Sequence, residues 1–455
     1  MRTHVFGNLY ILMSSALPSR LDSRTGDIPG WRAVFGNSFW LLVERCARWG
    51  LGLTVGVWTA RYLGPADFGL FNSALAWVAL FACAAGLGVE SIVVRELIRR
   101  PAERARLLAT AFGLRIAGGT LFTALPIFAA FLWPAASPPL GLTAIASLAT
   151  LFGIGEVFDL WFQARLRARP AALTRTAIFL AACLVRLALI AFAAPVSAFL
   201  WLVAAEAALA ALALAIVFLH GERPPLGRFS PTLARELLRE SWPNLVGNLA
   251  CLSYARVDRV MLAALSGEAA AGQYSAAANL VEVWSFFPLA LINSATPLLT
   301  RLHAADPAGY ARELARIARF HAAAAWAVVI FLVAVAPWLV SMLYGAAYSE
   351  AVPTLQLFAC SLPFAFVGIA ASPWYLNAGL TRVAMRRHLL GAALNLGLNA
   401  YLIPRWGAVG AAGATTAAYA FAHVFANAFD VRTRPLLLLQ LRALLLMPAH
   451  PARSP

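Results

Sequence analysis

Three charged residues occupy a stretch of the chain whose composition otherwise suits a membrane interior. The segment YARVDRVMLAAL, residues 254–265, places Arg256, Asp258 and Arg259 within four positions, and the segments on both sides are apolar. A guanidinium is a planar donor that binds carboxylate or phosphate through two parallel hydrogen bonds. A carboxylate inside a membrane holds a proton or a small cation, or pairs with a base. The segment therefore indicates an anion site, an ion-coupling site or a structural ion pair.

A second set of charges lies early in the first long apolar segment. Glu44, Arg45 and Arg48 occur there, too far from the segment's ends for their charges to reach water easily. At 100° per residue, small and polar residues share the face of Arg45: Ser38, Arg48, Gly52, Gly56 and Thr59. Two later segments carry similar stripes: Ser241, Asn244, Asn248 and Arg259, and then Ser275, Asn279, Glu282, Ser285 and Asn293. We expect the three stripes to line a shared hydrophilic cavity.

These patterns give candidate residues for two kinds of site. The anion-binding candidates are Arg45, Arg48, Arg256 and Arg259, with Arg115 and Arg186 as secondary candidates. The ion-coupling candidates are Glu44, Asp258 and Glu282. A structural interpretation stays open, because buried arginine–acid pairs also join helices and Arg259 could extend its charge to the membrane surface.

The composition indicates the elements that must position these residues. The 455-residue chain is 61% hydrophobic and only 12% charged, and its mean hydropathy is +0.74. A soluble domain is about half apolar and about a quarter charged. The chain is therefore predicted to be an all-α integral membrane protein. Its five cysteines lie in apolar segments without metal-ligand spacing, so we expect buried thiols and no metal site.

Twelve apolar segments approach or exceed the roughly 20 residues that span a bilayer. The eleventh is the shortest, and it is retained because the charge pattern needs a crossing there. The predicted spans are 38–62, 69–93, 107–132, 140–162, 176–194, 196–219, 241–265, 272–299, 320–343, 351–376, 389–402 and 408–429.

The basic residues are distributed very unequally between the two sides of these spans. The chain has 36 basic residues, all arginine, and 28 of them lie in the two terminal tails and in the loops after the even-numbered spans. Only Arg61 and Arg405 lie on the opposite side. Positive loops face the cytoplasm, so both termini are predicted to be cytoplasmic. The same asymmetry explains the net charge of +16 without a nucleic-acid partner.

An internal repeat divides the spans into two halves. LGPADFGLFNSA at residues 63–74 aligns with SGEAAAGQYSAA at 266–277, at an offset of 203 residues. Six spans per half, related in parallel, is a known transporter plan with the substrate between the halves. We therefore expect an N-terminal extension, a first lobe, a linker, a second lobe and a basic tail, at residues 1–37, 38–220, 221–240, 241–430 and 431–455.

The segments outside the spans carry no recognisable catalytic motif. The outer loops are short, and no HExxH, GxSxG, Walker A or paired-carboxylate motif occurs in the soluble segments. We expect no enzyme activity and no cofactor, apart from a coupling H⁺ or Na⁺ ion.

The chain resembles the Wzx-type polysaccharide flippases of the multidrug/oligosaccharidyl-lipid/polysaccharide exporter superfamily. The resemblance rests on RYLGPADFG at 61–69 with VVREL at 93–97, on residues 254–299, and on WGAVGAAGATTAAYAF at 406–421. It implies a two-lobed fold with a central cavity. Arg45, Arg48, Arg256 and, less closely, Arg259 match positions of the family's cationic cavity.

The resemblance also implies a function and a location. The family moves undecaprenyl-diphosphate-linked oligosaccharides across the inner membrane for O-antigen, exopolysaccharide or capsule synthesis. The expected partners are that lipid-linked glycan, membrane lipids, and the polysaccharide polymerase and export machinery. Two alternatives stay open: a cation-coupled drug or small-solute exporter of the same superfamily, and a membrane-embedded sugar polymerase or ligase.

Overall fold

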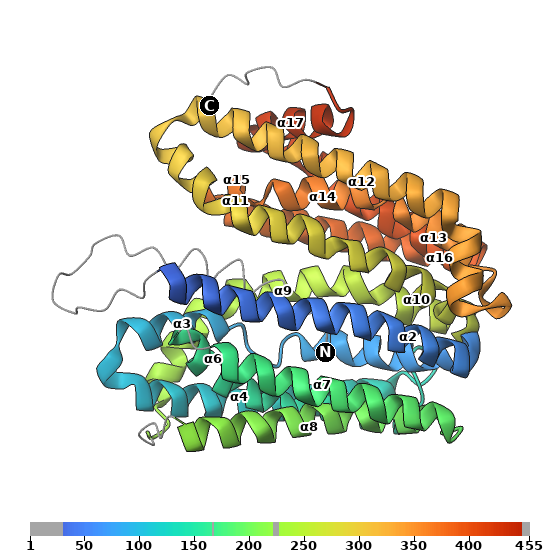
Figure 1. The fold of residues 1–455 in the computed structure, drawn as a ribbon, viewed down its shortest axis with the longest axis horizontal. Helices are drawn as coiled ribbons and strands as arrows, with labels where there is room; N and C mark the ends of the chain where they lie inside the picture. Colours follow the sequence, from blue (N-terminus) through green and yellow to red (C-terminus); the bar gives the residue numbers. More distant parts are fainter. Residues whose placement is uncertain (1–30, 166–167, 222–226, 448–455) are drawn as a thin grey trace. The chain divides into compact units, whose positions relative to one another are not determined.

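The structure is a computed structural model that describes residues 31–165, 168–221 and 227–447. Within these ranges the description leaves out the side chains of residues 31–49, 168, 243, 244, 247, 248 and 250–255. The described chain forms helices and short connections only (Figure 1). By contact it divides into unit 1, the described residues up to 62 and from 74 to 252, and unit 2, residues 63–73 and the described residues from 253 onward.

Unit 1 contains six complete α-helices and parts of two others. Its complete helices are α3 (Glu90–Arg99), α4 (Arg104–Leu132), α5 (Leu140–Phe152), α6 (Glu156–Ala164), α7 (Ala168–Ala191) and α8 (Val196–Gly221). It also includes most of α2 (Trp31–Ala82) and the part of α9 (Pro231–Ser266) up to Leu252. The helix α5 packs against both α4 and α8, and α7 packs against α8. A large apolar core, which includes Val93, Leu107 and Trp161, joins α3, α4 and α6.

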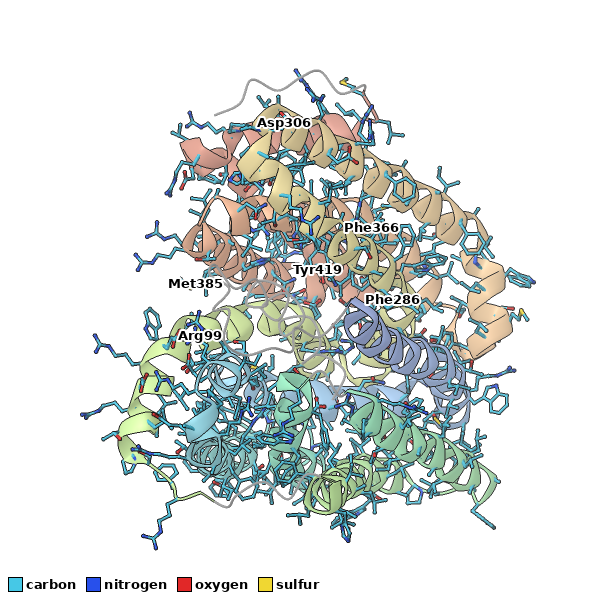
Figure 2. All side chains as sticks on the ribbon, turned by 60° about the vertical axis from the view of Figure 1, so that its left-hand side comes forward. Arg99, Phe286, Asp306, Phe366, Met385 and Tyr419 are labelled. Atoms are coloured by element: carbon cyan, nitrogen blue, oxygen red, sulfur yellow. The ribbon has the colours of Figure 1, made fainter. Side chains whose placement is uncertain are left out.

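Unit 2 contains the remaining helices. They are α10 (Glu268–Glu282), α11 (Phe286–Ala305), α12 (Pro307–Tyr344), α13 (Ala351–Ala359), α14 (Leu362–Ala370), α15 (Ser372–Asn377), α16 (Thr381–His423) and α17 (Arg434–Leu444). The helix α12 packs along α13, α14 and α17, and α16 packs against α10, α13 and α14. Phe366 of α14 is fully buried among these helices (Figure 2).

The helices agree with the predicted spans. Nine helices of the described chain are long and apolar enough to cross a membrane. Two of these nine hold two predicted spans each, because α2 bends at Gly64 and α16 bends at Gly407, where both glycines have positive φ. The helix α9 carries the predicted span 241–265. The all-α membrane fold is therefore confirmed, including the short eleventh span.

Several spans are interrupted inside the membrane region. The second is broken by a turn at residues 83–88, the fourth by a 3₁₀ turn at Gly153–Gly155 and the eighth by one at Val283–Ser285. Hydropathy did not predict these breaks. At the first break, hydrogen bonds such as Leu87 N to Ala84 O, 2.8 Å, satisfy backbone groups that lipid could not satisfy.

One end of the predicted elements differs from expectation. The helix α2 begins at Trp31, before the predicted Ser38. The contact-based division falls after Leu252, inside α9. The helix α9 thus runs from unit 1 into unit 2 without a break.

The repeat is visible in the backbone. Gly64 has φ 72° and ψ 172°, and its counterpart Gly267 has φ 88° and ψ 165°. Positive φ in this range favours glycine. Each glycine therefore ends the helix before it and lets the next helix start in a new direction, so both halves open with the same turn.

The helices that follow these two turns make a close contact inside unit 2. A Cβ atom on Gly69 would lie 1.7 Å from the carbonyl oxygen of Glu268. A Cβ atom on Gly272 would lie 1.9 Å from the carbonyl oxygen of Pro65. Ser73 adds a 3.0 Å hydrogen bond to the Glu268 carboxylate. Both glycines are therefore required because backbone meets backbone at these positions.

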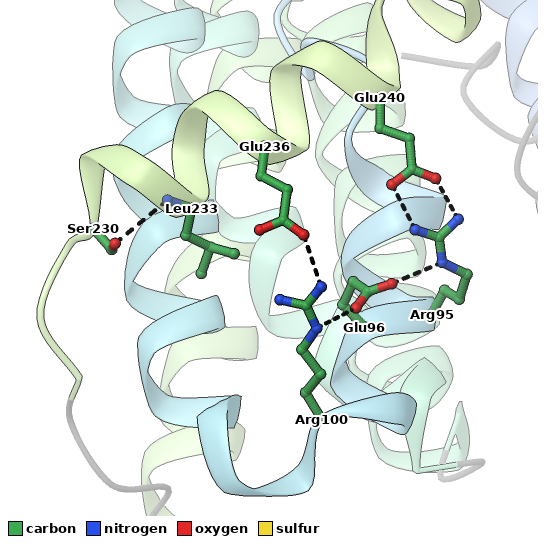
Figure 3. A network of polar contacts seen from close by, with 7 residues as sticks. All are labelled: Arg95, Glu96, Arg100, Ser230, Leu233, Glu236 and Glu240. Atoms are coloured by element: carbon green, nitrogen blue, oxygen red, sulfur yellow. Dashed lines mark hydrogen bonds and ion pairs between the residues drawn. The ribbon is translucent and has the colours of Figure 1, made fainter.

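A polar network joins α3 to the first turns of α9 within unit 1 (Figure 3). Arg95 forms a bidentate pair with Glu240 at 2.5 and 2.6 Å and a 2.9 Å bond with Glu96. Arg100 bonds Glu96 at 2.8 Å and Glu236 at 2.7 Å. The bond with Arg95 lowers the pKa of Glu240, and that with Glu240 raises the pKa of Arg95.

We expect Glu240→Gln to lower the thermal stability of the protein at neutral pH and to matter less in acid. The lowered pKa means that the ion pair stabilises the fold above the ordinary pKa of glutamate and loses this effect as the pH falls through the lowered value. The Glu240 side chain is 47% exposed, so screening limits the effect to about 1 kcal/mol or less. Thermal unfolding in detergent at both pH values measures it.

Glu103→Gln is the control, because Glu103 forms no ion pair among the described residues. An equal loss of stability in both variants, or a Glu240→Gln effect that grows in acid, would contradict this account of the network.

Candidate functional site

Asp258 lies at the centre of a buried polar cluster in unit 2. Its side chain comes from α9 and only 2% of the residue is exposed. Tyr274 of α10 donates a hydrogen bond to its carboxylate at 2.6 Å, Asn399 of α16 donates one at 2.5 Å, and Thr415 of α16 donates a third. All three donors are neutral, and no described arginine lies within ion-pairing distance of the carboxylate.

A second layer of oxygen atoms surrounds this carboxylate. Asn395 accepts a 3.1 Å bond from Asn399, and the carbonyl oxygen of Ala411 lies 3.0 Å from the Thr415 hydroxyl oxygen. The side-chain oxygen of Asn399 is buried and has no hydrogen-bond partner. One carboxylate with several neutral oxygens nearby suits a proton, which the carboxylate itself can bind. It also suits a small cation such as sodium, because hard cations prefer oxygen ligands. The described residues contain no group of three or more acidic, histidine or cysteine side chains that could hold a metal ion.

The bend in α16 makes this arrangement possible. Gly407 turns the chain back, so that the part after it returns along the part before it. Asn395 and Asn399 are one turn apart on the first part, and Thr415 faces them from the second part. A straight helix could not bring both Asn399 and Thr415 to one carboxylate, with Asn395 bonded to both of them.

Arg259, the next residue of α9, is paired with a candidate coupling acid. Its guanidinium bonds the Glu282 carboxylate at 2.8 Å. The Arg259 side chain is 3% exposed and the Glu282 side chain is 37% exposed. The structure thus brings together Asp258, Arg259 and Glu282, but the buried arginine bonds Glu282 and not Asp258.

The other anion-binding candidates are placed only in part. Arg256 lies on α9 and is half-buried. Glu44, Arg45 and Arg48 lie on α2, but their side chains are outside the described residues.

Arg115 is held by two acids in unit 1. Its Nη2 atom donates to Glu90 at 2.8 Å and to Glu156 at 2.9 Å, and its side chain is 5% exposed. The three residues come from α4, α3 and α6, beside the breaks in the second and fourth spans. Any anion that bound Arg115 would compete with both carboxylates. The geometry therefore favours a role in joining these helices.

Arg186 has a different environment. It lies on α7 in unit 1, and its Nε atom is buried without a hydrogen-bond partner. No described acid forms an ion pair with it.

Sequence reasoning missed most of the partners in these clusters. Asn395 and Asn399 carried a usable signal, because two amides four residues apart on an apolar span mark one polar face. Tyr274 and Thr415 carried none, since each is common in membrane helices and its contact lies on another helix. Glu90 carried the signal of an acid inside the predicted span 69–93, but its contact with Arg115 is 25 residues away.

The sequence is similar to one of the known protein families that were compared with it. The family described as polysaccharide biosynthesis protein matches residues 34–303. No curated protein matches the sequence.

Solved structures of membrane transporters have the same fold. An inward-facing multidrug resistance MATE family transporter of the MOP superfamily matches with a TM-score of 0.68 and 15% identity, covering 88% of this chain and 95% of that one. The lipid II flippase MurJ in an inward closed conformation matches with a TM-score of 0.67 and 14% identity, covering 90% and 91%. A MOP superfamily transporter from Pyrococcus furiosus matches with a TM-score of 0.60 and 13% identity, covering 92% and 97%.

At these identities the structural matches establish the fold, while the family match covers more than half of the sequence. The chain therefore belongs to the polysaccharide biosynthesis protein family and is a multi-pass membrane protein with the fold of MOP superfamily transporters.

Proposed function

We propose that the protein is a flippase that moves undecaprenyl-diphosphate-linked oligosaccharides across the cytoplasmic membrane for the synthesis of a surface polysaccharide. Both termini would face the cytoplasm, as the distribution of the arginines predicts. The family supports a role in polysaccharide synthesis, and the fold supports transport. The observation that carries the proposal is the charge arrangement on α9, where an arginine and an acid lie side by side in a predicted span with different partners.

The arginines suit the headgroup of such a substrate. A diphosphate has several oxygens and more than one negative charge, and arginine binds phosphate oxygens in a bidentate manner. Arg256 and Arg259 lie on α9, and Arg45 and Arg48 lie on α2. Glu282 balances Arg259 in the present structure. A bound diphosphate would take over that role, while the polyprenyl chain stayed in lipid.

Asp258 suits the coupling ion. A buried carboxylate without an ion-pair partner among the described residues is costly in a membrane, because hydrogen bonds from neutral donors offset only part of the cost of burying its charge. Binding a proton or a sodium ion removes the cost. We propose that Asp258 takes up this ion in one state of the transport cycle and releases it in another, so that an ion gradient drives the substrate movement.

A second candidate function is a cation-coupled exporter of drugs or small solutes. The specific observation in its favour is the fold match to the multidrug transporter together with the Asp258 cluster, which would serve either substrate. The arginines distinguish the two, because a cationic drug would be repelled by Arg256 and Arg259.

The test is to delete the gene and identify the lipid-linked saccharide that accumulates at the cytoplasmic face. Accumulation of an undecaprenyl-diphosphate oligosaccharide with loss of the surface polymer supports the flippase. Normal polymer with increased drug sensitivity would favour the exporter and reject the flippase.

We expect alanine at Arg45, Arg48 or Arg256 to reduce polymer export in the deletion strain by roughly tenfold or more. A hydrogen bond between charged groups contributes about 1.5–3 kcal/mol, and about 1.4 kcal/mol corresponds to a factor of ten. Lysine should restore the charge without the bidentate contact and give partial export. Polymer on the cell surface and protein in the membrane are measured together.

Arg442→Ala is the control, because Arg442 is exposed on α17 after the last span. An arginine that only locks an acid would behave differently: its alanine variant would be lost from the membrane, and neutralising the acid as well would rescue it. Normal export by stable variants at all three positions would reject the cationic diphosphate site.

A further inference from the structure

A groove opens between α2 and α7 on one side of unit 1. Its volume is about 570 Å³, within the range of about 300–1,000 Å³ that is usual for ligand pockets. It is lined by Trp58, Arg61, Tyr62, Leu187, Ile190 and Ala191. One wall thus carries an arginine and two aromatic rings, and the other wall is entirely aliphatic.

The groove is bounded at both ends. At the inner end, Val55 of α2 packs against Phe179 and Cys183 of α7, with Leu187 beside them. At the outer end, the Tyr62 hydroxyl donates a 2.9 Å hydrogen bond to the carbonyl oxygen of Ala194, just after α7. The two helices are therefore held together at both ends of the groove. Both contacts lie within unit 1, so the groove does not depend on the placement of unit 2.

Arg61 at this groove has no partner among the described residues. It is exposed and forms no hydrogen bond or ion pair within the described chain. Arg405, the other arginine on the side away from the basic loops, differs. Its guanidinium lies 3.7 Å from the centre of the Tyr401 ring and donates to the Tyr401 carbonyl oxygen at 2.6 Å.

A second arginine without an acid lies near the same groove. Arg186 precedes Leu187 on α7, one helical turn before Ile190, and its Nε atom is buried without a partner. The two helices that form the groove therefore carry two positive charges that no described acid balances. The groove combines an aliphatic wall, a tryptophan that is 50% exposed and, at its rim, a guanidinium without a partner among the described residues.

We propose that this groove binds one anionic phospholipid, with its phosphate on Arg61 and an acyl chain along Leu187 and Ile190. Charge complementarity selects an anionic headgroup, and the aliphatic wall selects a chain. The orientation predicted from the arginines places the site in the outer leaflet. The groove lies wholly in unit 1, so a lipid can occupy it without any movement of the lobes. A resident lipid needs a site of this kind, whereas a transported lipid does not.

The test is native mass spectrometry of the delipidated protein in detergent, titrated separately with phosphatidylglycerol, phosphatidylcholine and undecaprenyl phosphate. We expect the wild type to bind one phosphatidylglycerol more tightly than phosphatidylcholine. Arg61→Ala should weaken phosphatidylglycerol binding by roughly tenfold, as loss of one charge-assisted contact implies. Arg61→Lys should keep part of the preference, and Leu187→Trp, which fills the groove, should weaken binding of both lipids.

Arg405→Ala is the matched control, and we expect it to bind as the wild type does. Equal binding by Arg61→Ala and wild type would overturn the proposal. An equal loss in Arg405→Ala would also overturn it, because the preference would then reflect overall positive charge and not a specific site. Preferential binding of undecaprenyl phosphate, lost in Arg61→Ala, would replace the phospholipid by the transported class of lipid and reject the occupant proposed here. Elution of each variant on size exclusion checks that it is folded.

Discussion

Replacing Asp258 by asparagine is expected to abolish transport and to leave the protein folded in the membrane. The carboxylate accepts bonds from Tyr274, Asn399 and Thr415. Two of these donors are hydroxyls, and a hydroxyl can rotate to accept a bond from the new amide. The cluster can therefore stay satisfied, but it loses the charge that binds a proton or cation. Polymer export in the deletion strain and protein abundance in the membrane are the measurements.

The control is Asp430→Asn. Asp430 lies after the last span and bonds Arg432, which lowers its pKa to about 2. We expect its replacement to leave export unchanged. Glu44→Gln and Glu282→Gln complete the set, since either acid could hold the coupling ion instead. Wild-type export by Asp258→Asn, across imposed proton and sodium gradients, would remove Asp258 from the mechanism.

Alanine at Gly69 or Gly272 is expected to cost about 1–3 kcal/mol of stability, the usual range for overpacking. Each added Cβ would lie less than 2 Å from a carbonyl oxygen of the facing helix. Backbone cannot move aside as a flexible side chain can, so the two helices must separate. Thermal unfolding in detergent, followed by size exclusion, measures the loss.

The double variant tests whether the two glycines take part in the same helix–helix contact. Once Gly272→Ala has separated the helices, Gly69→Ala meets less resistance, so the two losses should sum to more than the loss of the double variant. Gly141→Ala is the control, because a Cβ there would meet no atom within 4 Å. Additive losses, or no loss at all, would mean that the helices are not in backbone contact at these glycines.

Hydropathy and arginine placement were sufficient to predict the membrane helices. All twelve predicted spans correspond to helical segments because each must satisfy its own backbone in lipid, and this requirement leaves a long apolar signal in the sequence. The breaks inside the spans left no such signal. The turn at residues 83–88 and the 3₁₀ turn at Gly153–Gly155 are as apolar as their surroundings, and local backbone hydrogen bonds satisfy the first of them.

The candidate site could be predicted only where one helix determines it. Asp258, Arg259 and Glu282 were found because a charge in an apolar span is conspicuous by itself. Their pairing was not found. Arg259 bonds an acid 23 residues away, and Asp258 bonds Asn399, 141 residues away, in place of its neighbouring arginines. Such contacts follow from how the helices pack and bend, for example at Gly407.

The glycine contact also has a symmetry. The offset that aligns Gly69 with Gly272 aligns Pro65 with Glu268. Gly69 meets the carbonyl of Glu268, and Gly272 meets the carbonyl of Pro65. Each hairpin therefore touches the other through the same pair of positions, as in the isologous interface of a twofold-symmetric homodimer. This single chain therefore contains a contact like the one between two identical subunits. A substitution at one of these glycines lies against the equivalent position of the other repeat.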